Sequence, residues 1–167
     1  MHNNNKLQIE SIRNNCLKSR ITHEYKELSK IYAINDESIV LFYDTQTNTI
    51  KITINNEYTF IVNSKYPFES PLFHFNKQPY SHYLRLPSQR FSEHLKKFTS
   101  KTCLCCSSLC CKYNWSPAIK LTMFVDELNK IRQYKRNIVY KILSDKIKDK
   151  YLIDDVQLDS FLFPLVL

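Results

Sequence analysis

With 167 residues, of which 43% are hydrophobic and 24% are charged, the chain has the composition of a globular protein with room for one core. No apolar run reaches the roughly 20 residues that a membrane-spanning helix needs, so the sequence predicts a soluble protein. The net charge of +8 favours acidic partners. The lysines are spread along the chain without a basic-aromatic motif, so nucleic-acid binding is only a distant alternative.

The chain begins with a polar stretch, and we expect a disordered tail over residues 1–5 and a single domain over residues 6–167. The start has no basic region followed by an apolar core, as a secretory signal would, so we expect a reducing compartment, cytoplasmic or nuclear. From Lys6 onward, apolar residues recur every three or four positions, which predicts one or two amphipathic helices ending near Lys30. Cys16, in this stretch, is interpreted as a small buried apolar residue.

Three runs rich in β-branched and aromatic residues follow, at 38–43, 49–54 and 58–63, and they predict an antiparallel meander. A fourth strand is expected from Pro71 to Phe75. The chain contains no glycine, so its turns must rely on Asn, Asp, Ser and Pro. The connection Asn55-Asn56 predicts a tight hairpin in which both asparagines have positive φ. A helix, this meander and later helices together predict an α+β fold.

Helix signals return after the strands. Ser88 precedes apolar residues at helical spacing, which predicts an amphipathic helix with Phe91, Leu95 and Phe98 on one side. Ser116-Pro117 is typical of a helix start, with Ser as the N-cap and Pro in the first turn. We expect one helix from there and another from about Lys135. A short amphipathic segment is expected in residues 152–163.

Five of the six cysteines lie in one short segment that also holds the only tryptophan. They are Cys103, Cys105, Cys106, Cys110 and Cys111. In a reducing compartment, thiols this close together favour thiolate chemistry or metal binding over structural disulfides. Trp115 stands beside the predicted helix start and is interpreted as a packing residue of the core.

Three motifs occur in a fixed order along the chain: Tyr66 to Pro71 (YPFESP), Cys103-Leu104, and Trp115 to Pro117 (WSP). In this order they resemble the motifs of the ubiquitin-conjugating enzymes, including divergent members from large DNA viruses. The resemblance covers roughly residues 18–163. The pattern from Arg20 to Leu28 (RITHEYKEL) resembles the first helix of that family, which docks the activating enzyme and ligases. The resemblance implies an α+β ubiquitin-conjugating-enzyme-like fold with a four-stranded antiparallel meander, a cysteine-rich active-site loop and C-terminal helices.

The resemblance also implies an activity. Ubiquitin or a ubiquitin-like protein would be accepted as a thioester on Cys103 and passed to an amine, with an activating enzyme and a ligase as partners. Cysteine suits this reaction because its thiolate is a strong nucleophile near neutral pH. Lys101 is close enough in sequence to lower the pKa of Cys103. Cys105 and Cys106 are alternative nucleophiles, and no cofactor is required.

One motif of active family members does not occur. Their reactive cysteine is preceded by a His-Pro-Asn triplet, whose asparagine helps to organise the site and to stabilise the oxyanion. Here His82 and Asn76 are separated from each other and lie far upstream of Cys103. An alternative is therefore a catalytically inactive variant that binds ubiquitin or another protein without chemistry.

A further alternative is a zinc-stabilised interaction module. The spacing C-x-x-C is typical of zinc sites, and four cysteines could supply soft ligands: Cys103, Cys106, Cys110 and Cys111. Two adjacent cysteines rarely both reach one ion without strain. His94 or His82 could then complete the site.

Overall fold

The computed structural model describes residues 2–32 and 38–151, and the chain divides into two compact units. The first unit consists of Met1–Tyr83 and Cys105–Glu127, and the second of Leu84–Leu104 and Leu128–Leu167. The single domain expected for residues 6–167 stays a prediction. The amphipathic segment expected in residues 152–163 lies outside the described residues.

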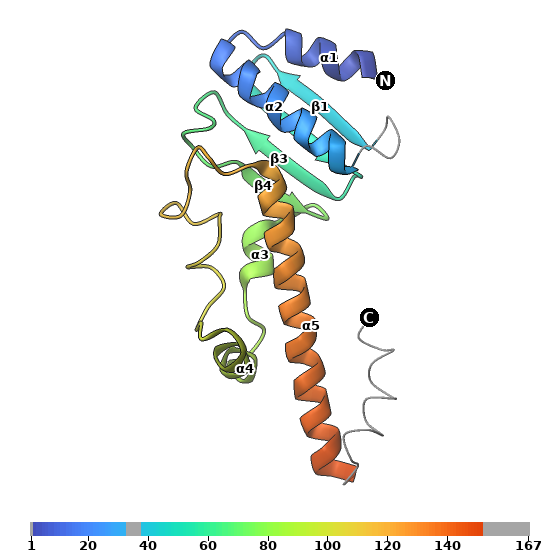
Figure 1. Ribbon diagram of the computed structural model, residues 1–167, viewed down its shortest axis with the longest axis vertical. Coiled ribbons are helices and arrows are strands. Elements are labelled where there is room, and N and C mark those ends of the chain that lie inside the picture. The colour runs from blue at the N-terminus through green and yellow to red at the C-terminus, as the bar shows by residue number, and fades with distance from the viewer. Residues whose placement is uncertain (1, 33–37, 152–167) are drawn as a thin grey trace. The chain divides into compact units, whose positions relative to one another are not determined.

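The first unit is built on an antiparallel sheet whose strands lie side by side in chain order (Figure 1). Its strands are β1 (Ile39–Asp44), β2 (Thr49–Ile54), β3 (Tyr58–Val62), β4 (Leu72–Phe75) and the short β5 (Gln78–Pro79). The first four strands confirm the predicted meander. The fifth was not predicted, because a two-residue strand leaves no alternation to detect. Alternate side chains of β1 to β4 point into the core, as a half-buried sheet requires.

Asparagines form the turns that glycine forms in other proteins. Asn48, Asn55, Asn56 and Asn76 have φ between 47° and 56°. Asparagine tolerates this left-handed backbone better than most residues that carry a Cβ. The predicted positive φ at both asparagines of the β2–β3 hairpin is confirmed. In the β1–β2 turn, the side chain of Asn48 also accepts a hydrogen bond from the Tyr43 hydroxyl, at 2.8 Å.

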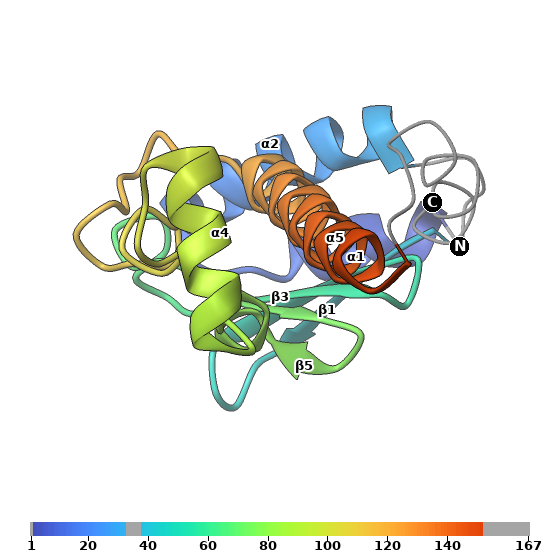
Figure 2. The same cartoon turned by 90° about the horizontal axis from the view of Figure 1, so that it is seen from below.

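Two helices precede the sheet, α1 (His2–Glu10) and α2 (Asn15–Tyr32). Helix α2 covers one face of the sheet, and α1 lies along β1 (Figures 1 and 2). Two helices agree with the prediction, but the expected disordered tail does not match, because the chain is helical from His2. Asn5, inside that expected tail, is only 6% exposed and bonds to the backbone of β1. Sequence periodicity could not reveal this, since the contact is made by a polar side chain.

The inner face of α2 carries Leu17, Ile21, Glu24 and Leu28, all buried. These positions are four, three and four residues apart, the spacing of one helix face. The interpretation of Cys16 as a buried residue is wrong, because its side chain is exposed. A helix advances about 100° per residue, so the position next to the inward Leu17 points away from the core.

Glu24 is fully buried and joins three separate parts of the first unit. One carboxylate oxygen accepts a hydrogen bond from the Tyr66 hydroxyl (2.9 Å) and pairs with Arg20 (2.6 Å). The other oxygen accepts from the backbone N–H of Leu121 (3.0 Å). Arg20 also donates to the carbonyl of Ile119 (2.7 Å). Burial and the charge of Glu24 raise the pKa of Tyr66, so its hydroxyl remains a donor to the carboxylate.

Helix α5 (Leu121–Tyr151) begins later than expected and continues without a break. Ser116 caps a turn instead of the helix. Its side chain accepts a hydrogen bond from the N–H of Ala118 (3.3 Å), and its carbonyl accepts one from the N–H of Ile119 (3.0 Å). The separate helix expected from Lys135 is part of α5. No proline or glycine interrupts residues 121–151, so nothing in the sequence ends the helix there.

The second unit contains α4 (Gln89–Thr99) and the part of α5 from Leu128 onward. Helix α4 confirms the prediction, with Ser88 as its N-cap accepting from the N–H of Phe91 at 3.2 Å. Phe91 and Leu95 are buried, but Phe98, which was expected beside them, is exposed. None of the helices in the described residues is long and apolar enough to span a membrane.

Replacing Glu24 should destabilise the first unit strongly. Glu24→Ala leaves the buried N–H of Leu121 and the buried hydroxyl of Tyr66 without their acceptor, and the half-buried Arg20 without its ion-pair partner, which costs about 3 kcal/mol in comparable sites. Urea unfolding followed by the fluorescence of Trp115 measures the loss. The matched control is Glu27→Ala on the same helix, because Glu27 pairs with Lys30 and Lys120 at the surface. Equal shifts of the two midpoints would contradict the role of Glu24.

Candidate functional site

The cysteine segment is an irregular loop between α4 and α5. Cys103 is half-buried and is followed by the buried Leu104, whereas Cys105 and Cys106 are exposed. Farther along, Cys110 and Cys111 are half-buried. The loop therefore presents its first thiols to solvent next to an apolar anchor.

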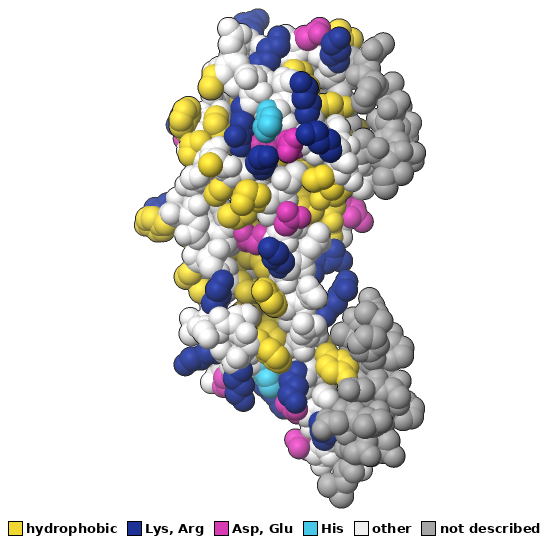
Figure 3. Space-filling view, viewed as in Figure 1, with side chains coloured by type: hydrophobic (Ala, Val, Ile, Leu, Met, Phe, Trp, Pro, Cys, Tyr) yellow, Lys and Arg dark blue, Asp and Glu magenta, His cyan; other side chains and the backbone are white. Residues whose placement is uncertain are grey.

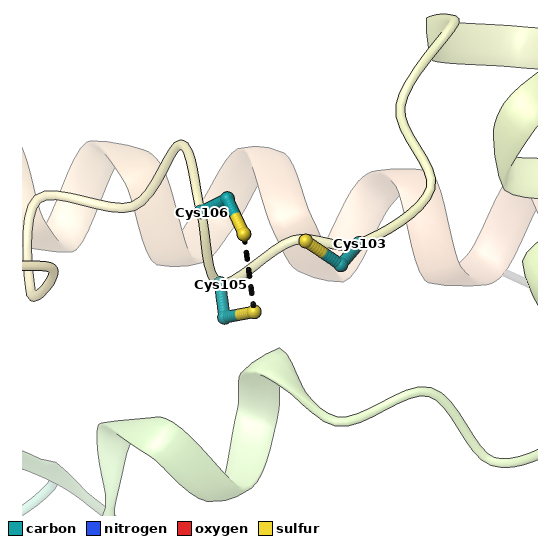
Figure 4. Close-up of side chains that lie close together, drawn as sticks. All are labelled: Cys103, Cys105 and Cys106. Atoms are coloured by element: carbon teal, nitrogen blue, oxygen red, sulfur yellow. Dashed lines mark hydrogen bonds between the residues drawn. The ribbon is translucent and has the colours of Figure 1, made fainter.

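Three of these thiols lie together. The sulfur atoms of Cys103, Cys105 and Cys106 are all within 4.8 Å of one another, and those of Cys105 and Cys106 are 3.9 Å apart. In Figure 4 the three sulfurs point toward one another. The proximity is local, because the residues belong to four consecutive positions of one loop. Thiolates at this spacing could hold a metal ion.

This group differs from the expected ligand set. Cys105 takes part in place of Cys110 and Cys111, and among the described residues no histidine or carboxylate joins the three sulfurs. The expected completing ligands are on helices: His94 is buried in α4, and His82 is exposed on α3 (Tyr80–Leu84). The group does contain two adjacent cysteines, but they are Cys105 and Cys106 instead of Cys110 and Cys111.

Glu127 of α5 fixes the second half of the loop. One carboxylate oxygen accepts from the backbone N–H of Leu109 (2.9 Å), and the other accepts from the hydroxyl of Tyr80 (2.7 Å). Burial and this hydrogen bond to a carboxylate raise the pKa of Tyr80, which keeps the hydroxyl protonated. Sequence reasoning missed Glu127 because a glutamate in a helix carries no sign of partners 18 and 47 positions away.

Asn114 and Ser108 hold the middle of the loop. The side-chain amide of Asn114 donates to the carbonyls of Cys106 (2.8 Å) and Ser108 (3.0 Å). Ser108 is buried, and its hydroxyl accepts a hydrogen bond from the N–H of Cys110 (3.1 Å). The carbonyl of Ser108 accepts a hydrogen bond from the N–H of Cys111 (3.0 Å). These polar contacts give an irregular loop a defined path.

Cys110 is a poor nucleophile in this setting. Burial, together with the nearby charge of Glu127, raises the pKa of its thiol to about 12. Because only the thiolate attacks, the raised pKa makes this thiol slow to react near neutral pH. The reactive thiols must therefore be sought elsewhere in the loop.

Two of the three motifs that carry the family resemblance meet in space. The indole N–H of Trp115 donates to the carbonyl of Pro67 (2.9 Å), and the rings of Trp115 and Tyr66 are 6.1 Å apart. Trp115 also packs against Phe124 of α5, with ring centroids 5.9 Å apart. Trp115 packs as expected, but it is half-buried and lies at the margin of the core.

Asn76 and His82 occupy positions that local structure explains. Asn76 lies in the turn between β4 and β5, where its φ is 47°. His82 is exposed on α3, and its ring contacts that of Tyr83 at 5.6 Å. Figure 3 shows Lys and Arg side chains spread over the viewed face with Asp and Glu between them, so that face has no single basic patch.

Comparison with known proteins gives no match to a family model, to a curated protein or to a solved structure. The residues and contacts of the site therefore carry the functional proposal.

The raised pKa of Cys110 predicts slow alkylation. At pH 8, iodoacetamide should modify Cys110 roughly 10²- to 10³-fold more slowly in the folded protein than in urea. The reason is that folding raises the pKa of this thiol from its ordinary value of 9.0 to about 12. Glu127→Gln removes the nearby negative charge and should speed the reaction, although burial keeps it slower than in urea. Peptide mass spectrometry measures both rates.

The control for this variant is Asp126→Asn, which removes an equal charge from the neighbouring exposed position of α5. It should leave the alkylation rate of Cys110 unchanged. An unchanged or slower rate in Glu127→Gln would show that its carboxylate does not act on the thiol.

Proposed function

We propose that the chain is a ubiquitin-conjugating-enzyme-like protein that carries ubiquitin or a ubiquitin-like protein as a thioester on Cys103. The observation that carries the proposal is the contact of Trp115 with Tyr66 and Pro67, which joins the motifs on either side of the cysteine loop. The order of elements in the first unit, helices, antiparallel meander and a later helix, supports the same class.

Cys103 is the preferred nucleophile for two reasons. It precedes Leu104, whose burial anchors the chain beside the thiol, and Cys110 is disfavoured by its raised pKa. The thiolate of Cys103 attacks the acyl carbon of the modifier, a C–S bond forms, and the thiolate of the activating enzyme leaves. A substrate amine then attacks the same carbon, a C–N bond forms, and Cys103 leaves as a thiolate while the nitrogen loses a proton. A ligase is the expected partner for this second step.

Asn114 has a positioning role in this proposal. Its amide already donates to two loop carbonyls, so it holds the chain that follows Cys103 and does not replace the missing His-Pro-Asn asparagine as an oxyanion donor. The missing triplet supports the alternative of a catalytically inactive protein that binds ubiquitin or another partner. The same contacts would serve that alternative, and thioester formation separates the two.

The convergence of three sulfurs favours a second candidate function, a zinc-stabilised interaction module. Zinc prefers four ligands, and Cys105 and Cys106 are exposed, so solvent or a partner side chain can supply the fourth beside three thiolates. A thiolate bound to zinc is a weaker nucleophile than a free one. Zinc and the thioester would therefore compete for Cys103.

Thioester formation tests the first function. With activating enzyme, ATP and ubiquitin, the wild type should give an adduct on a gel that reducing agent removes. Cys103→Ser should give a thiol-resistant ester or no adduct, because an oxygen ester is not cleaved by thiols. Cys105→Ser and Cys106→Ser should keep the labile adduct, and Cys16→Ser, an exposed thiol on α2, is the matched control.

Two results would contradict this assignment. A labile adduct that survives in Cys103→Ser and disappears in Cys105→Ser or Cys106→Ser would move the nucleophile along the loop. The absence of a thiol-sensitive adduct with several ubiquitin-like modifiers would leave the binding-only alternative.

Metal content tests the second function. After zinc loading and desalting, the wild type should hold close to one equivalent of zinc by elemental analysis. Cys105→Ser should lose most of it, since two thiolates bind far more weakly than three, whereas Cys16→Ser should keep it. Zinc-free wild type after the same treatment would exclude the site.

A further inference from the structure

Strand β1 is the outer strand of the described sheet and would expose an unpaired edge without α1. In an antiparallel ladder, alternate residues of an edge strand turn their N–H and C=O groups away from the neighbouring strand. Such a row of free groups is a template for pairing with another chain. In β1, the outward groups belong to Ile39, Leu41 and Tyr43.

Two side chains of α1 bind this row. The amide of Asn5 donates to the carbonyl of Ile39 (2.8 Å) and accepts from the N–H of Leu41 (2.9 Å). Gln8, one helical turn later, accepts from the N–H of Tyr43 (3.0 Å). The Asn5 amide thus makes the two bonds that a peptide group of an adjacent strand would make.

Helix α1 is also attached to α2, where Asn5 donates to the Tyr25 hydroxyl (3.2 Å) and Lys18 donates to the carbonyl of Glu10 (3.0 Å), but it brings few apolar groups to the sheet. Its sequence, HNNNKLQIE, begins with residues of low helix propensity and does not form an apolar face. Its Leu7 is 62% exposed. The amide contacts of Asn5 and Gln8 therefore account for much of its attachment to the sheet, so losing them should release the edge.

We propose that α1 is an edge cover that prevents β1 from pairing with β1 of a second copy of this chain. The sequence of β1 suits such a pair. When two copies align antiparallel about Leu41, Val40 of one copy lies opposite Phe42 of the other on the outer face of the sheet. These side chains are 50% and 56% exposed, and apolar pairs of this kind stabilise adjacent strands. The proposal does not depend on the function of the cysteine loop.

The test is the oligomeric state of variants that lose the cover. The double variant Asn5→Ala with Gln8→Ala should form dimers that dissociate on dilution, measured by analytical ultracentrifugation between about 1 and 100 µM, while the wild type stays monomeric. The matched control, Asn4→Ala with Lys6→Ala, changes exposed positions of the same helix and should behave as the wild type. Deletion of residues 2–10 should dimerise as the double variant does.

A second pair of changes locates the interface. Adding Val40→Lys and Phe42→Lys to the double variant places like charges opposite each other across the proposed pair and should restore the monomer. Circular dichroism verifies that each variant is folded, and if the double variant is not, Asn5→Asp alone replaces it. Asn5→Asp keeps an acceptor for Leu41 but loses the donor to Ile39. A folded variant that stays monomeric at 100 µM overturns the proposal, as does a dimer that persists with both lysine substitutions.

Discussion

The first unit depends on the buried carboxylate of Glu24. A charge that is buried away from solvent is stable only with partners. The two carboxylate oxygens of Glu24 have three: the guanidinium of Arg20, the hydroxyl of Tyr66 and the first N–H of α5. One side chain of α2 thereby sets the position of the turn after β3 and of the start of α5. Three residues of the pattern that resembles an enzyme-docking helix, Ile21, Glu24 and Leu28, thus belong to the interior. Only the outer positions of α2, such as His23 and Lys26, are left for a partner.

Glu127 holds the cysteine loop through its carboxylate, as Glu24 holds the sheet and helices of the first unit. Each of its oxygens binds a different segment, one the loop at Leu109 and the other α3 through Tyr80. A carboxylate with two oxygens can join two pieces of irregular chain that have no backbone pairing with each other. Its charge has a second effect, because it adds to the burial that keeps Cys110 protonated. Glu127 therefore holds the loop and also disfavours Cys110 as a nucleophile.

Local sequence patterns correctly predicted those structural features that are determined by residues close together in the chain. The strands followed from alternation, the left-handed turns from asparagine, and the start of α4 from Ser88 before an apolar helix face. Contacts between distant polar side chains had no such pattern. Asn5 meets β1 across 34 positions, and Glu127 meets Tyr80 across 47, so neither role could be predicted. The sequence predicted that cysteines of this loop would cluster, but not which ones. That depends on the path of the loop, which Asn114 helps to fix.

Oxygen and nitrogen groups hold the cysteine loop on its path. The carboxylate of Glu127, the amide of Asn114 and the hydroxyl of Ser108 hold it, and none of these groups changes with the supply of oxidant. Exposed thiols such as Cys105 and Cys106 can pass through sulfenic acid or a mixed disulfide with glutathione without breaking those contacts. Oxidation of these two thiols would then leave the path of the loop in place, and reduction would return the thiols without refolding.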